Sequence, residues 1–464
     1  MSNNWGVSLT HIDLPEFELP RELPAIPDQT YAARVEALYA AMERRGLDAV
    51  VVYGDREHFA NTAYLTGFDP RYEESLAIFV PGRTPRMLVG NESVSYAGVV
   101  PYPVDVVRQS KFSLVGQPDP DDVSLSQQLK DAGLADPGIR RVGLAGWKYW
   151  DGGAGVEGWL EVPHFIVTEV GALVTEVVNA SDIFTGMHDG LRLVNDVDQI
   201  ACFEFAASHG SQAVRRLISG IRVGMTELEA SALMNPVMLP FSYHPTMLSG
   251  DLRTSWGVAS PSGRVMEVGD RVCAGLGYWG SNTARAGYLA EDVSQIPEAQ
   301  RGYIEKIVAP YYATAAAWYE TVRVGITAGE LYEVTASRIG DPYYGVFLNP
   351  GHHIHLEEWP VSTVRAGSTA VFRSGAAVQL DIIPGTGSGM QNAQIEDGVV
   401  LADDGLRAEL RAAYPAMWAR IQARRDMLAD VFGIQVHESV LPLSNSAGYL
   451  PPFWLSPSLA MTKA

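Results

Sequence analysis

Two spacings of hydrophobic residues run along the chain, and they predict its helices and strands. Apolar side chains recur every three or four positions, the helical spacing, in residues 31–46, 198–221, 298–321 and 406–432. Short apolar runs rich in β-branched residues are typical of buried strands. The clearest run is Leu47–Gly54, and further strands are expected within residues 76–82, 86–90, 142–150, 243–289 and 344–401.

The order of these elements predicts an arm followed by two domains, in an α+β fold. Residues 1–30 are rich in proline and acidic residues and are expected to form an arm over the surface, with the first regular element after Asp28. Helices and strands alternate with short turns through residues 31–187, as in a small α/β domain. Residues 188–464 form a second domain in which helical segments precede strand-rich segments. Within it, Thr226 and Glu229 have the spacing of a capping box at a helix start.

Composition and charge exclude several classes of protein. The 464 residues suit two domains. With 34 basic and 54 acidic residues the net charge is −20, so we expect no binding to nucleic acid or to anionic membranes. No apolar stretch reaches 18 residues and the N-terminus has no signal-peptide pattern. Two cysteines cannot build a disulfide framework or a cysteine-rich zinc site. These features predict a cytoplasmic protein.

The segment NPGHHIHLEEWP holds the densest set of groups that can exchange protons near neutral pH. His352, His353 and His355, three of ten histidines, stand within four positions and precede Glu357 and Glu358. On a strand alternate residues share a face. His353, His355 and Glu357 would then point one way, and His352 the other way with Glu358 next to it. Imidazole and carboxylate together indicate a proton-transfer or ligand cluster. The alternative is a solvated polar strand end or a structural hydrogen-bond network.

Acidic residues also interrupt two apolar runs further along the chain. Asp381 lies inside VQLDIIPG, and Glu396 and Asp397 lie inside QIEDGVVL. A carboxylate in such a run needs a partner or takes a raised pKa. Together with the histidines, these residues predict an inward-facing polar pocket in a curved sheet.

The motifs of the chain, taken in order, resemble those of the creatinase, aminopeptidase P and prolidase family. The resemblance covers most of residues 30–430. It implies a small N-terminal α/β domain and a C-terminal pita-bread domain. It rests on RVEALYAAMERRGLDAVVV, NTAYLTGF, the stretch 198–206, IRVGMTELEA, GRVMEVGDRV, GYWGSNTARAG, the histidine segment, the Asp381 strand and IEDGVVLADDG.

Departures from the family pattern bear on the mechanism. Metal-dependent members hold two metal ions with two Asp, one His and two Glu. The resemblance places Gly275 and Asn282 at the two Asp positions, His352 at the His position, and Asp381 and Glu396 at the Glu positions. A dinuclear centre is therefore not expected. Trp359 stands where relatives carry a catalytic histidine, and the upstream histidine is missing near Val258.

Further residues are predicted to bind substrate. Besides His353 and Glu357 they include Arg285, at a position that family members commonly fill with Arg, although a structural salt bridge is the alternative. Arg71 and Tyr72 follow YLTGF, and in creatinase-like dimers this region can reach the active site of the partner. His244 and Trp256 are expected at the pocket mouth.

The leading hypothesis is a homodimeric, creatinase-like hydrolase that cleaves a C–N bond of a small nitrogen-containing substrate without a dinuclear metal centre. His352 or His355 would act as general base, Asp381 or Glu396 would orient the imidazole, and Glu358 would donate a proton to the leaving nitrogen. No cofactor is required in this interpretation.

Two alternatives stay open. In the first, one Zn, Fe or Mn ion is held by His352, Asp381 and Glu396, and the enzyme is an aminopeptidase- or prolidase-like hydrolase or a lyase. In the second, the chain is a non-catalytic binding module on the same fold. The three clustered imidazoles argue against the second.

Overall fold

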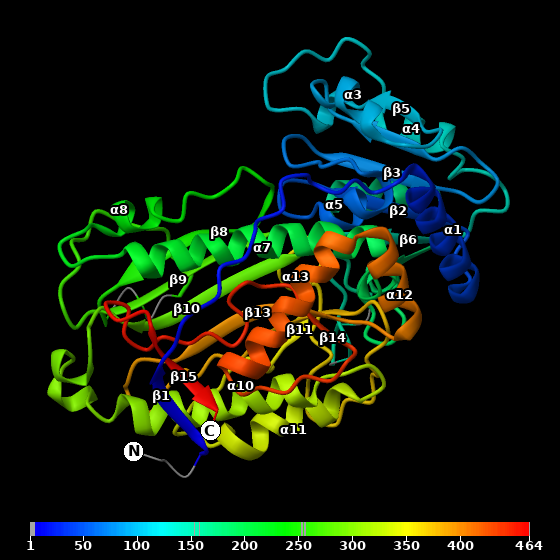
Figure 1. Cartoon of the computed structure of the whole chain (residues 1–464). Coiled ribbons are helices and arrows are strands. Elements are labelled where there is room, and N and C mark those ends of the chain that lie inside the picture. Colours follow the sequence, from blue (N-terminus) through cyan, green and yellow to red (C-terminus); the bar gives the residue numbers. More distant parts are fainter. Residues whose placement is uncertain (1–4, 153, 157, 252–253, 255–256, 464) are drawn as a thin grey trace. The chain divides into compact units, whose positions relative to one another are not determined.

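The chain divides into two units at residues 25–26 and 193–194 (Figure 1). The small unit is Ile26–Leu193, and the large unit combines Met1–Ala25 with Val194–Ala464. The computed structural model describes residues 5–152, 154–156, 158–251, 254 and 257–463. No helix within these ranges has the length and apolar character needed to cross a membrane.

A mixed sheet in the order β5-β4-β3-β2-β6-β7 forms the centre of the small unit. β2 runs parallel to β6 and β6 to β7, whereas β2–β3 and β3–β4 are antiparallel. The strands are β2 (Ala49–Gly54), β3 (Ser75–Phe79), β4 (Arg86–Val89), β5 (Asp105–Arg108), β6 (Arg141–Ala145) and β7 (Glu176–Asn179). The helices are α1 (Asp28–Arg45), α2 (Ala60–Thr66), α3 (Ser93–Tyr96), α4 (Leu125–Asp131), α5 (His164–Gly171) and α6 (Asp182–Thr185).

Helices cover both faces of this sheet, which explains the continuous apolar run of β2. Val50 and Val52 pack in one cluster with residues of α1 and α2. Ala49 and Val51 pack in another with residues of α4 and α5. Helix α1 ends at Gly46, whose φ of +60° favours glycine. The helix and strand predicted for this region are confirmed.

The large unit is built on an antiparallel sheet in the order β11-β12-β13-β10-β9-β8, with β14 also paired to β13. The strands are β8 (Phe241–Ser249), β9 (Arg271–Tyr278), β10 (Ser281–Tyr288), β11 (His352–His353), β12 (Ala377–Asp381), β13 (Gln394–Leu401) and β14 (Val440–Pro442). The helices are α7 (Val197–Gly220), α8 (Glu227–Ala232), α10 (Ala309–Thr321), α11 (Ala328–Ile339), α12 (Asp404–Ala413) and α13 (Pro415–Asp426). π-Helical turns at Ile304–Val308 and Met427–Val431 extend α10 and α13.

Helix α7 packs against the β9–β10 hairpin (Figure 1). The hairpin turns through Gly280, whose φ is +81°. A Cβ atom there would lie 1.8 Å from the Phe203 ring of α7. Glycine is therefore required both for the turn and for the close approach of the helix. The predicted capping box of Thr226 and Glu229 is present at the start of α8.

The expectation that regular structure begins only after Asp28 is wrong. Strand β1 (Val7–His11) pairs antiparallel with β15 (Leu459–Lys463). The rest of the arm is held by side chains of α7, since Arg215 donates to Pro15 O and Cys202 donates to Pro24 O. The partner strand is 450 residues away in sequence, so no local pattern could have shown this pairing.

A histidine bridges two carboxylates in the small unit. His58 Nδ1 lies 2.9 Å from Asp55 Oδ1, and its Nε2 lies 3.1 Å from Glu161 Oε1. The hydrogen bond that His58 donates to Asp55 raises the pKa of His58 above its usual range, burial opposes the rise, and the charge of Glu161 adds to it. Burial would raise the pKa of Asp55, but its bonds with His58 outweigh this and lower it to about 2.

This bridge predicts a pH-dependent stability. A raised histidine pKa contributes stability that is fully present below the unfolded-state pKa and is lost as pH rises through the folded-state value. Asp55 stays ionised throughout this window. The difference in unfolding free energy between wild type and His58→Gln should therefore shrink from pH 5 to pH 9 in urea titrations. His164→Gln, at an exposed histidine, is the control. A difference that is flat or grows with pH would contradict the assignment.

Candidate functional site

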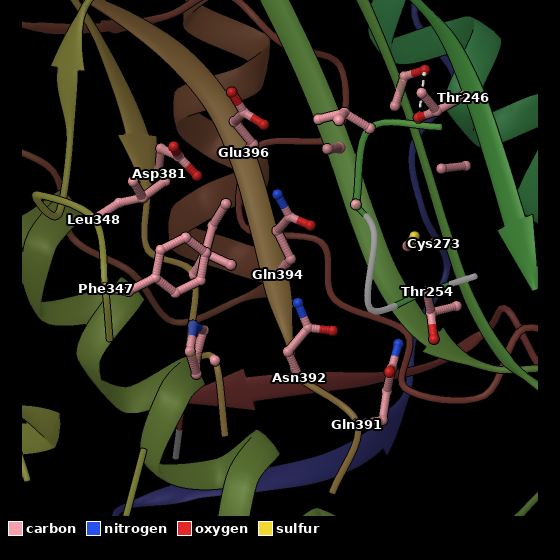
Figure 2. A pocket seen from close by; sticks show the side chains of 18 of the residues that line it. Thr246, Thr254, Cys273, Phe347, Leu348, Asp381, Gln391, Asn392, Gln394 and Glu396 are labelled. Atoms are coloured by element: carbon pink, nitrogen blue, oxygen red, sulfur yellow. Dashed lines mark hydrogen bonds between the residues drawn. The ribbon is translucent and has the colours of Figure 1, made fainter. Parts of the chain in front are cut away.

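A cavity of about 600 Å³ opens over the sheet of the large unit. Strands β8, β9, β10, β12 and β13 supply its floor, and segments that follow β8, α11, β11 and β12 supply the rest (Figure 2). The lining side chains are mostly polar or aromatic and include Tyr243, Thr246, Thr254, Val258, Arg271, Cys273, Asn282, Phe347, Leu348, Glu358, Trp359, Asp381, Gln391, Asn392, Gln394 and Glu396.

Four of the predicted site residues converge at one end of this cavity, where Glu358, Asp381 and Glu396 line the wall and His352 is fully buried against them. His352, Glu358, Asp381 and Glu396 each offer a ligand atom, and these atoms all lie within 4.8 Å of one another. The sheet register brings them together, because Asp381 of β12 is directly opposite Glu396 of β13. β11 adds His352 beside β12, and Glu358 follows in the next loop.

The His352 ring is held in one orientation. Its Nδ1 lies 2.9 Å from the carbonyl oxygen of His353, which can only accept a hydrogen bond, so Nδ1 carries a proton. Trp359 stacks on the ring with centroids 4.2 Å apart and an angle of 16°. Nε2 therefore faces the carboxylates, 3.1 Å from Glu358, 3.8 Å from Asp381 and 4.0 Å from Glu396.

Burial and mutual repulsion shift the pKa values of this cluster. Burial raises the pKa of Asp381, which the charge of His352 only partly offsets. Burial and the neighbouring charge of Asp381 raise the pKa of Glu396 further, although Asn282 donates a hydrogen bond of 2.8 Å to it. Burial disfavours protonated His352, but Glu358 and Asp381 outweigh this effect and the pKa is raised. When its three carboxyl groups are ionised, the cluster therefore carries more negative than positive charge.

Among the described residues that line the β9 side of the cavity, none carries a carboxylate. Gly275 is paired with Ala284, and Gly277 is paired with Asn282. A Cβ atom at Gly277 would lie 2.8 Å from Ser242 Oγ. Gly275, at the first Asp position of metal-dependent relatives, offers no side chain, and Asn282, at the second, offers a neutral carboxamide to Glu396.

His353, His355 and Glu357 do not share a strand face, contrary to the prediction. Strand β11 ends at His353, so the alternation does not continue. His353 lies 3.3 Å from Thr363 Oγ1, and burial, the charge of His352 and that of Arg373 lower its pKa to about 3. His355 packs edge-on against Phe203 of α7. None of the three lines the cavity.

The other predicted binding residues lie in different surroundings. His244 is exposed and its Nε2 lies 3.1 Å from Val258 O, at the cavity wall. Trp256 lies outside the described residues. In the small unit, the Arg71 guanidinium stacks over Phe59, and Tyr72 is 62% exposed. That these two reach the active site of a partner in a homodimer stays a prediction.

Arg285 belongs to the interior of the large unit. All five of its N–H donors meet protein acceptors, with Nη2 2.5 Å from Asp397. Ser444 and Ser446 also donate to Asp397. Both charged side chains are fully buried, so the structure gives Arg285 a structural salt bridge and leaves no donor for a substrate.

Sequence reasoning missed several residues of the cavity wall. Tyr243 and Phe347 add aromatic surface, and Asn392 and Gln394 add carboxamides. A signal for the amides was present, because polar Asn392, Gln394 and Glu396 alternate with apolar Ala393 and Ile395, the period of a half-buried strand.

Comparison with known proteins agrees with this architecture. Residues 34–146 match the Creatinase/Prolidase N-terminal domain family. Over 229 residues the chain is 24% identical to the uncharacterized peptidase YqhT of Bacillus subtilis (strain 168), a match that covers 47% of this chain and only 62% of that relative. A Xaa-Pro dipeptidase from Bacillus anthracis superposes with a TM-score of 0.60 at 18% identity, over 81% of this chain and 96% of that one. The aminopeptidase PepP of Pseudomonas aeruginosa gives 0.57 at 15%, over 87% and 100%.

The chain has the fold of the creatinase, aminopeptidase P and prolidase family. The resemblance stated from the motifs is thereby confirmed, as is the α+β class with a creatinase/prolidase N-terminal domain. Within this family fold the cavity end formed by His352, Glu358, Asp381 and Glu396 is the candidate functional site.

The buried Arg285–Asp397 pair gives a stability prediction. Arg285→Met leaves Asp397 buried without its cation, which typically costs about 3–5 kcal/mol. The urea transition of the large unit should move accordingly, whereas Arg301→Met, at an exposed arginine, should change the free energy of unfolding by less than about 0.5 kcal/mol. An Arg285→Met protein with unchanged stability would contradict the structural role.

Proposed function

We propose that the chain is a hydrolase that cleaves a C–N bond of a nitrogen-containing substrate. The observation that carries the proposal is the convergence of His352 with Glu358, Asp381 and Glu396, three carboxyl groups that line one cavity. The names of the relatives, which include peptidase, dipeptidase and aminopeptidase, support the same class of reaction.

The charge of the cluster favours a single divalent cation, the mononuclear alternative, over a metal-free centre. Three carboxylates and one imidazole leave negative charge in excess, and burying it without compensation is costly. Arg271 is the one arginine or lysine among the described lining residues, and it is paired with Asp251. Asp381 Oδ1 is buried with no hydrogen-bond partner among the described residues.

The donor set suits one ion of Zn, Fe or Mn, held by His352, Asp381 and Glu396, with Glu358 beside it. One imidazole nitrogen and two carboxylate oxygens are acceptable ligands for each of these metals. When bound, such an ion supplies a Lewis acid for the scissile carbonyl and lowers the pKa of water.

The side chains around the cluster have separate tasks. Asn282 orients Glu396 through its Nδ2 donor. Trp359 and the carbonyl of His353 fix the His352 ring. Glu358 is the most accessible member, with 27% of its side chain exposed, so it is the group that exchanges protons with the reacting atoms. General acid–base catalysis of this kind contributes roughly 100- to 10,000-fold.

A metal-free centre is the second candidate. Its support is the raised pKa of Asp381 and of Glu396, because a carboxyl group that keeps its proton also relieves the excess charge. In that case His352 would be the general base and Glu358 the proton donor to the leaving nitrogen.

Loss of either central residue should abolish turnover. His352→Ala and Asp381→Asn are expected to lower kcat/KM at least 100-fold, with an unchanged circular dichroism spectrum. Xaa-Pro dipeptides and creatine-like, ureido and cyclic amidine compounds are the substrates to assay. Asp430→Asn, at an exposed position, is the matched control. Normal activity in either site variant would refute the assigned roles, and a wild-type protein inactive on every C–N substrate would favour a binding module.

Cation binding can be tested without a substrate. Mn²⁺ or Zn²⁺ at 100 times its dissociation constant should stabilise the wild-type protein by about 2.7 kcal/mol, seen as a higher Tm. The double variant Asp381→Asn/Glu396→Gln should lose this stabilisation. An equal shift in both proteins would place the ion elsewhere.

A further inference from the structure

The cavity face of β13 continues beyond the reactive cluster as a row of carboxamides. Glu396, Gln394 and Asn392 are alternate residues and all line the cavity, whereas Ala393 and Ile395 between them pack into the core. Figure 2 shows Gln394 next to Glu396 on the strand and Asn392 beyond it, in the segment that leads into β13.

The two carboxamides have no hydrogen-bond partner for their side chains among the described residues. Both side chains are half-buried at the cavity wall. Gln391 differs, since its Nε2 donates to Val272 O at 3.2 Å. Each free carboxamide offers two N–H donors and one carbonyl acceptor. Such a group is matched by a ligand that also presents one N–H and one C=O, which is an amide.

The spacing of the row also fits a peptide. Residues two apart on a strand are about 6.6–6.8 Å apart. Gln394 is the first residue of β13 and Asn392 lies two residues before it. The same repeat separates alternate groups of an extended peptide, so a ligand that follows β13 and the segment before it would meet Gln394 and Asn392 in turn. Phe347, a residue that is 66% exposed, lines the same cavity and offers an apolar surface to such a ligand (Figure 2).

We propose that the cavity binds substrates with at least one further amide group beyond the scissile C–N bond, extended along β13 and recognised by Gln394 and Asn392. The inference rests on the proposed function, since it places the scissile bond at the His352 cluster. It assigns specificity to two residues outside that cluster. Peptide-like substrates would be preferred over compact compounds that have no second amide.

Binding of a blocked peptide tests this inference. The probe is N-acetyl-alanyl-alanine N-methylamide, compared with its ester analogue, in which oxygen replaces the central N–H. Calorimetric titration of the full chain with each ligand gives both dissociation constants. The variants are Gln394→Met and Asn392→Leu, which keep size but remove hydrogen bonding, and Gln435→Met at an exposed position of the same unit is the control.

Wild type and Gln435→Met should bind the amide about 3- to 10-fold more tightly than the ester. This ratio of dissociation constants corresponds to the net contribution of one neutral hydrogen bond. Removing the carboxamide that contacts the central N–H should abolish this ratio, and either variant should weaken binding of the amide by a similar factor. Unchanged affinities in both variants, or no binding of the blocked peptide to wild type, would overturn the inference.

Hydrolysis assays separate this inference from the proposed function. If the binding pattern holds but no C–N substrate is cleaved, the proposed reaction fails and the peptide site stands. If C–N substrates are cleaved and KM for extended peptides is unchanged in Gln394→Met and Asn392→Leu, the reaction stands and the inference fails.

Discussion

The structure of the site depends on the burial of three carboxyl groups beside one imidazole. Asp381 and Glu396 face each other across β12 and β13, and Glu358 and His352 close the group. Negative charge in such a place must be neutralised by protons, by a cation or by substrate. Structural stability alone would be better served by apolar residues, so retention of this cluster points to chemistry.

Two neighbouring acids on β13 illustrate the difference between structural and reactive charge. Glu396 and Asp397 are adjacent and therefore face opposite sides of the strand. Asp397 meets Arg285 and two serine hydroxyls, a complete set of partners. Glu396 receives one hydrogen bond from Asn282 and otherwise faces two acids and the shared imidazole of His352. The sheet thus carries a neutral ion pair on one face and an uncompensated cluster on the other.

The sequence predicted those parts of the fold that depend on local spacing. The helix that ends at Gly46, the buried run of β2 and the capping box at Thr226 follow from periodicity and short-range chemistry. The pairing of β1 with β15 depends on residues at opposite ends of the chain, so it could not be read from either segment.

The same limit applies to the site. His352, Asp381 and Glu396 were identifiable because ionisable residues interrupt apolar runs. The different surroundings of His353 and His355 were not, because they depend on the strand ending after two residues. Stacking of Trp359 on His352 and the inward position of Gln394 arise from how loops and strands meet, which spacing alone does not specify.

The number of metal ions held by each chain tests the account most directly. Elemental analysis of the purified protein, before and after chelator treatment, should find about one Zn, Fe or Mn ion per chain, lost together with hydrolytic activity and restored with it. A protein that hydrolyses its substrate with no bound ion would contradict the single-cation centre. Two ions per chain would contradict the conclusion that the wall formed by Gly275, Gly277 and Asn282 lacks the carboxylates for a second ion.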